Sequence, residues 1–231
     1  MKKATWRLGA IVLGALLIAS ASEAAPITFY SGDGGDLVNG GAAVHIASHA
    51  VWGDVSSYAG LDGDEAEWIS FANTGVGGIV VPDAVSRTIG NETALYTRQF
   101  SLSDDSHLSL WVLADDTATV LLRGPNSFVQ TLFTAFDKQF DYCAPGGSGL
   151  GLGCMQPDMG HAEVDNLGAG DYTLEVYAFQ THADVFGAQY AGEITSNHDT
   201  RSVPEPASLL MLGTGVVGLF AMRSRGRRAS R

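Results

Sequence analysis

The sequence predicts an all-β protein, an antiparallel β-sandwich of the jelly-roll type, placed between two terminal targeting segments. Short segments that alternate apolar and polar residues recur about every 10–15 residues with turn residues between them, which is typical of a sandwich. Glycine makes up 29 of 231 residues, and each glycine costs about 1 kcal/mol inside a helix. No strand–helix–strand alternation and no internal repeat is visible. Long helices are therefore not expected in the body of the chain.

The strands are expected where this alternation is clearest. Residues 26–43 are rich in glycine, aspartate and asparagine and are predicted to form a loop. A first strand is expected over 44–51 and a short one over 67–71, followed by a glycine-rich loop over 73–78. Stronger period-two patterns begin at Leu95 and predict strands over 95–102, 107–114, 117–123, 128–133, 161–165, 172–179 and 189–195. Tight turns at the aspartate pairs 104–105 and 115–116 separate the central strands.

The N-terminus has the pattern of an export signal. Lys2, Lys3 and Arg7 precede an apolar run of twelve residues, Leu8–Ala19, and small residues follow at the positions that a signal peptidase reads. Cleavage is expected beside Ala24 and Ala25. Twelve residues are too few to cross a membrane core of about 30 Å as a helix, so a cleaved signal is favoured over an anchor.

The C-terminus combines three features in a fixed order. Pro204, Glu205 and Pro206 come first, the uncharged apolar run Ala207–Met222 follows, and an arginine-rich end closes the chain. The run predicts a short membrane-spanning helix, and the arginines predict a cytoplasmic end under the positive-inside rule. The expected organisation is a signal peptide at 1–25, a β-sandwich at 26–196, a linker with the sorting motif at 197–206, a transmembrane helix at 207–222 and a basic tail at 223–231.

Removal of both ends exposes how acidic the body is. The chain has a formal charge of −12, but residues 26–203 hold only five Lys and Arg against 23 Asp and Glu, a charge of −18. Nucleic acids and anionic membranes are bound through Lys and Arg that neutralise phosphates. The charge therefore argues against nucleic acid as a partner. Solubility alone also explains such a charge.

The two cysteines, Cys143 and Cys154, enclose a glycine-rich stretch of ten residues. In an exported protein this spacing predicts a disulfide that closes a loop, and closing a loop of this size stabilises the fold by about 3 kcal/mol on a chain-entropy estimate. A metal or redox pair would need closer spacing or additional His or Cys ligands.

Candidate chemistry in the body is weak. Asp115 and Asp116 are oxygen donors that suit Ca²⁺, and Asp104 or Asp105 is expected to approach them from a neighbouring turn. Paired aspartates are equally common as turn residues that bond to their own backbone. The sequence has neither a Gly-x-Ser-x-Gly elbow nor a phosphate-binding glycine loop with a lysine, so no catalytic residue is predicted.

Aromatic side chains are the other candidates. Rings beside polar groups form many ligand sites, and stacking on sugar rings would need exposed aromatic faces. The candidates are Trp52, Trp68, Trp111, Tyr177 and Phe179. Burial in the core of the sandwich is the competing interpretation.

The C-terminal tail consists of Pro204, Glu205 and Pro206, the apolar run and the arginines. This combination resembles the sorting signal of the PEP-CTERM proteins of Gram-negative bacteria. The resemblance covers residues 203–231. It implies export, retention in the membrane, and recognition and cleavage near Pro206 by an exosortase-type transpeptidase. An ordinary C-terminal anchor that is never processed is the alternative.

The body is similar to galactose-binding-like jelly rolls and related carbohydrate-binding domains over about residues 44–195. The Asp115–Asp116 turn, the following strand and the closing segment Gly170–Phe179 carry this likeness, although Arg123-Gly124 departs from the Asn-Gly ending of that strand.

The expected function is therefore that of an exported, non-catalytic cell-surface or extracellular-matrix protein with a structural or adhesive role. Its expected partners are the export machinery, signal peptidase, an exosortase, the membrane and extracellular polysaccharide. Two alternatives remain open: a carbohydrate-active hydrolase on the same fold, and a calcium-dependent adhesion module. No cofactor other than Ca²⁺ is considered.

Overall fold

The computed structural model describes residues 26–56, 66–136 and 152–197. The segment Ala24–Thr200 is a compact unit of its own. The predicted signal peptide, transmembrane helix and basic tail lie outside the described residues, as does all of the predicted linker except Asn197 at its start. Those assignments stay predictions.

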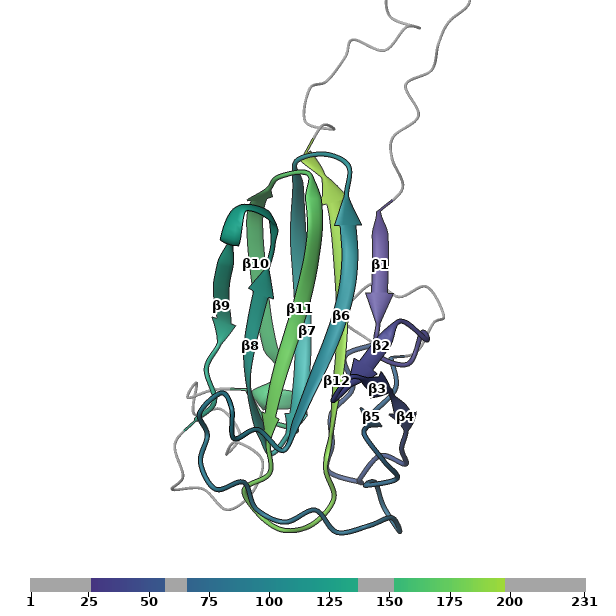
Figure 1. The fold of residues 1–231 in the computed structure, drawn as a ribbon. Helices are drawn as coiled ribbons and strands as arrows, with labels where there is room; N and C mark the ends of the chain where they lie inside the picture. The colour runs from purple at the N-terminus through teal and green to yellow at the C-terminus, as the bar shows by residue number, and fades with distance from the viewer. Residues whose placement is uncertain (1–25, 57–65, 137–151, 198–231) are drawn as a thin grey trace, which may run out of the picture. The chain divides into compact units, whose positions relative to one another are not determined.

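The described residues fold into two antiparallel β-sheets. The first sheet is here called the β7 sheet. Its strands follow in the order β10 (Gly160–Leu167), β7 (Ser106–Asp115), β12 (Gly187–Ser196), β5 (Ile69–Ser70) and β4 (Val44–His45). Strand β1 (Ile27–Tyr30) also pairs with β12. The second, the β11 sheet, has the order β3 (Gly41–Ala42), β2 (Asp36–Val38), β6 (Ala94–Leu102), β11 (Gly170–Phe179), β8 (Thr117–Arg123) and β9 (Val129–Phe133). Figure 1 shows β6, β11 and β8 in one layer and β7, β10 and β12 in the other.

This architecture confirms the predicted all-β, antiparallel sandwich. All strand pairs are antiparallel, and the only helical turns within the described residues are the short 3-10 segments η1 (Pro125–Ser127) and η2 (Gln156–Asp158). The finer jelly-roll assignment stays a prediction.

The hydrophobic core lies between the sheets and follows from strict alternation along the long strands. In β7, Leu108, Leu110 and Val112 are fully buried. From the facing sheet, Leu174 and Val176 of β11 join the same cluster. Because each buried side chain of this size contributes about 1.5–3 kcal/mol, the period-two pattern selects which face of each strand turns inward.

The prediction of a loop over 26–43 is wrong. This segment contains β1, β2 and β3, and their partners come from distant parts of the chain: β1 pairs with β12, and β2 with β6. Conversely, the strand expected over 44–51 shrinks to Val44–His45, and the one over 67–71 shrinks to Ile69–Ser70. In both cases pairing outweighs local composition.

The two ends of β7 carry different features. Asp104 and Asp105 lie in the turn before β7, whereas Asp115 and Asp116 lie at its other end, ten strand residues away. Ten residues of strand extend about 33 Å, so the expected approach of the two aspartate pairs is wrong. The backbone N–H of Asn197 bonds the Asp105 carbonyl at 2.8 Å. The described chain therefore leaves the sandwich at the end opposite to Asp115 and Asp116.

Candidate ligand-binding site

Trp52 stands between two hollows at the Asp115 end of the sandwich. One hollow, of about 240 Å³, is lined by residues that include His49, Asp115 and His182. The other, of about 310 Å³, has a more polar lining that includes Asp54 and Glu67. Trp52 belongs to the lining of both, and we call the two hollows together the Trp52 cleft.

The ring of Trp52 is fixed from two sides. It stacks on Trp68 with ring centroids 4.1 Å apart and an interplanar angle of 25°, and its indole N–H donates to Oδ2 of Asp115 at 2.7 Å. Trp68 is itself only 4% exposed and donates its N–H to the Gly53 carbonyl at 3.1 Å. A half-exposed indole held in this way presents a rigid apolar surface to a ligand.

The backbone after Trp52 is bonded to the segment around Cys154. The Gly53 N–H donates to the Cys154 carbonyl at 2.8 Å, and Asp54 exchanges backbone bonds with the side chain of Gln156 at 2.7 and 3.1 Å. A Cβ on Gly53 would lie 2.7 Å from the backbone nitrogen of Gln156. The approach of the two segments therefore requires glycine at this position.

A buried glutamine ties the same segment to the sheet beneath it. Gln189, on the outer face of β12, accepts the Val55 N–H at 3.1 Å through its amide oxygen. Its amide nitrogen donates to the Ala66 carbonyl at 2.7 Å and to a carboxylate oxygen of Asp54 at 3.2 Å. Sequence reasoning did not single out Gln189, because a polar residue at the outward position of a strand is ordinarily solvated.

The carboxyl groups of Asp115 and Asp116 lie at one wall of the cleft and are only 4% and 3% exposed. The peptide bond between them is cis. Oδ2 of Asp116 accepts three hydrogen bonds: from the N–H and hydroxyl of Thr181, at 2.7 and 2.9 Å, and from the N–H of His182, at 2.9 Å. Burial, followed by the charge of Asp116, raises the pKa of Asp115 well above its usual range.

These bonds bear on the predicted calcium site. Among residues 26–56, 66–136 and 152–197, no three or more His, Cys, Asp or Glu side chains are grouped so as to hold a metal ion. One oxygen of each aspartate already accepts from a protein donor, Trp52 for Asp115 and Thr181 with His182 for Asp116. Calcium at Asp115 and Asp116 stays an untested prediction.

The structure separates the five candidate aromatic residues into two groups. Trp68, Tyr177 and Phe179 are buried, the last two in a small cluster on the outer side of the β11 sheet, so the suggestion that they stack on sugars is wrong. Trp52 and Trp111 are half-exposed, and Trp111 lies on the face of β7 opposite to its buried aliphatic residues. Only these two remain candidates for ligand contact.

The remaining predicted sites fall largely outside the described residues. Ala24, Ala25, Pro204, Glu205 and Pro206 all do, and so does Cys143. Cys154 is fully buried beside Trp68 and Leu113, and no free cysteine is found in the described part of the chain. Its pairing with Cys143 stays a prediction.

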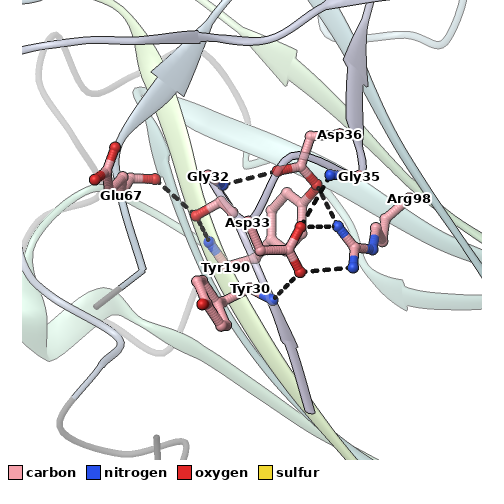
Figure 2. Close-up of polar contacts among 9 residues, drawn as sticks. Tyr30, Gly32, Asp33, Gly35, Asp36, Glu67, Arg98 and Tyr190 are labelled. Carbon is pink, nitrogen blue, oxygen red and sulfur yellow. Dashed lines mark hydrogen bonds and ion pairs between the residues drawn. The ribbon is translucent and has the colours of Figure 1, made fainter. Parts of the chain in front are cut away.

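A second polar cluster joins the loop after β1 to both sheets (Figure 2). The guanidinium of Arg98, on β6, pairs with both carboxylate oxygens of Asp33, with Nη2 to Oδ2 at 2.6 Å, and lies 3.5 Å from Asp36. Asp36 also accepts the N–H of Gly32 at 2.8 Å and the hydroxyl of Tyr190. The charge-assisted pair with Arg98 and the bonds to Asp36 therefore fix the loop after β1 against both sheets.

Comparison with known proteins identifies the tail. The model of the PEP-CTERM protein-sorting motif matches residues 202–228. The chain is therefore a β-sandwich protein with a PEP-CTERM sorting signal, and this signal implies an exported protein sorted to the cell surface. Within the described residues no helix is long and apolar enough to span a membrane.

The sandwich has a distant structural neighbour. It is similar to a cleaved adhesin domain of Lys-gingipain from Porphyromonas gingivalis, with 15% identity, 75% of this chain and 99% of that chain covered, and a TM-score of 0.36. No curated protein matches the chain.

Proposed function

We propose that this protein is a non-catalytic, adhesive component of the cell surface or extracellular matrix that binds polysaccharide through the Trp52 cleft. The observation that supports the proposal is the fixed, half-exposed indole of Trp52 between two hollows with polar groups. Small-molecule sites are usually lined by apolar and aromatic side chains, together with a few polar groups that point toward the ligand. Export through a signal peptide and processing by an exosortase belong to the same proposal.

The cleft is tested with purified full-length protein in detergent and an array of polysaccharides. Trp52→Ala removes the ring and is expected to weaken binding by about tenfold or more, in line with aromatic hot spots. Trp52→Phe keeps an aromatic face and is expected to retain most of the affinity. Phe133→Ala, a half-buried aromatic of β9 outside the cleft, serves as the control. Equal affinity of Trp52→Ala and the wild type would refute the assignment of the cleft.

Sorting is tested by the mass of the mature protein from its native host. Signal removal beside Ala24 and Ala25 and cleavage near Pro206 predict a product without residues 1–24 and without residues 207–231. Replacement of Glu205 by alanine is expected to leave the tail attached. A mature wild-type protein that still contains residues 207–231 would show that processing near Pro206 does not occur.

One observation favours the hydrolase alternative. Burial and the charge of Asp116 raise the pKa of Asp115 well above its usual range, and a carboxyl group with a raised pKa serves as the general acid in glycosidases. Both groups are almost fully buried, which argues against their contact with a substrate. Hydrolysis of a bound polysaccharide by the wild type that is lost in Asp115→Asn would establish the hydrolase.

A further inference from the structure

The outer face of the β7 sheet carries a row of side chains that crosses four strands. The register places His161 of β10 opposite Trp111 of β7, Trp111 opposite Ala191 of β12, and Ala191 opposite Tyr30 of β1. We call these four residues the aromatic strip. Since neighbouring strands lie about 4.8 Å apart, the strip extends about 14 Å across the sheet.

At one end of the strip two rings stack face to face, and in its middle a small side chain separates two partly exposed rings. The rings of Trp111 and His161 stack with centroids 4.7 Å apart and an interplanar angle of 10°. Ala191 is buried and lies between the half-exposed rings of Trp111 and Tyr30. These two rings also pack against the small cluster that contains Trp68, which supports them from below.

A second row runs beside the strip. Two residues further along each strand, Glu163 lies opposite Ser109, Ser109 opposite Glu193, and Glu193 opposite Thr28. We call these four residues the acidic row. It alternates carboxylates with hydroxyls, and β1, β7, β10 and β12 contain no Lys or Arg.

Glu163 is held ionised and in a defined position. One of its oxygens accepts the Ser109 hydroxyl at 2.6 Å and lies 2.6 Å from His107 Nε2, and the other lies 2.7 Å from His161 Nε2. Burial acts to raise the pKa of Glu163, but the hydrogen bonds from Ser109 and His107 outweigh it and lower the pKa overall. Glu163 therefore keeps its negative charge to a lower pH than an ordinary glutamate does.

We infer that the aromatic strip and the acidic row together bind an extended polysaccharide whose sugars carry free amino groups. The ring faces of the strip suit the apolar faces of sugar rings, and the carboxylates of the row complement ammonium groups. The four strands of this face contain no Lys or Arg with which to bind an anionic polymer. A second copy of this chain would bring two acidic faces together, which like charges disfavour.

The aromatic strip and the acidic row share no residue with the lining of the Trp52 cleft, so the two sites are tested separately. Full-length protein in detergent is titrated with oligomers of glucosamine and with their fully N-acetylated counterparts. The glucosamine oligomer is expected to bind about tenfold more tightly, with affinity that falls as salt is added, because the attraction is electrostatic. Equal affinity for the two oligomers, or no binding of glucosamine, overturns the inference.

Two variants locate the contact. Glu193→Gln removes one charge from the acidic row and is expected to weaken glucosamine binding about three- to tenfold. Asp83→Asn removes one charge from an exposed loop outside the β7 sheet and is expected to leave binding unchanged. Equal loss in both variants would show attraction to net charge alone and would overturn the assignment of this face.

Trp111→Ala tests the strip and is expected to weaken binding by about tenfold, with a circular-dichroism spectrum to confirm folding. If this variant does not fold, the comparison of glucosamine binding by Glu193→Gln and by Asp83→Asn still tests whether this face is the binding site. Binding of neutral polysaccharides that depends on Trp52, without binding of glucosamine, would refute this inference and leave the proposed function intact.

Discussion

The indole N–H of Trp52 donates a 2.7 Å hydrogen bond to Oδ2 of Asp115, from a loop to the end of β7, 63 residues away in sequence. The bond fixes the plane of the indole ring and satisfies one oxygen of an almost fully buried carboxyl group. The same contact thus serves the stability of the sandwich and the shape of the Trp52 cleft.

Replacement of Trp52 by phenylalanine should destabilise the protein while it preserves the aromatic face. The variant keeps a ring over Trp68 but removes a donor from a buried carboxyl group, which costs about 1–3 kcal/mol. Urea denaturation measures the change. Trp111→Phe makes the same chemical change on the half-exposed face of β7 and is expected to cost less than about 1 kcal/mol. Equal losses in the two variants would contradict a specific role for the bond to Asp115.

The stability of the protein should depend on pH through Asp115. Burial and the neighbouring charge of Asp116 raise the pKa of Asp115 above its unfolded value of about 3.9. The folded state therefore holds this proton more tightly than the unfolded state. The resulting stabilisation is fully present below the unfolded pKa and is lost as pH rises through the folded pKa.

Asp115→Asn imitates the neutral carboxyl group and removes this dependence. The free energy of unfolding of the wild type, relative to Asp115→Asn, is expected to fall as pH increases from about 4 upward. Asp83→Asn, at an exposed position, is the matched control and should show no such trend. A difference between wild type and Asp115→Asn that is constant or grows with pH would refute the assignment.

Gly35→Ala should damage the cluster of Arg98 and Asp33. A Cβ at Gly35 would overlap the Arg98 guanidinium, so the pair that joins the loop after β1 to β6 must open. Breaking a partly buried ion pair in this way is expected to cost about 2–4 kcal/mol. Gly41→Ala, whose Cβ would meet its nearest neighbour, the Val38 carbonyl, at 3.6 Å, is the control and should change stability by less than about 1 kcal/mol. Thermal unfolding of both variants separates the two cases, and a stable Gly35→Ala protein would show that the ion pair carries little energy.

The predicted disulfide should be present in the exported protein. Intact mass after alkylation is expected to show no modified cysteine without a reductant and two after reduction. Cys143→Ser and Cys154→Ser should each lower stability by about 3 kcal/mol, and the double variant should lose no more than either single one. Free thiols in the mature protein would contradict the predicted disulfide.

Prediction from sequence succeeded where the signal is local. Between Leu95 and Phe179, the alternation of apolar and polar residues predicted all six strands to within two residues at each end, because one buried face imposes a period of two on a strand. The sorting tail is local in the same sense, since its features occupy one continuous segment that the family model matches.

Prediction failed where partners come from distant parts of the chain. Ile27–Tyr30 and Asp36–Val38 are strands because β12 and β6 pair with them, although glycine and aspartate dominate the sequence around them. Aromatic composition likewise does not say that Trp68 is buried while Trp52 remains half-exposed on top of it.

The amino-acid sequence was therefore sufficient for the class of fold, the acidity of the body and the sorting signal, because periodicity, charge and a contiguous motif need no knowledge of contacts. Only the tertiary structure placed Trp52 beside Asp115 and aligned Trp111 with His161 and Tyr30. Those arrangements depend on loop packing and strand register, which are set by the sum of many long-range contacts.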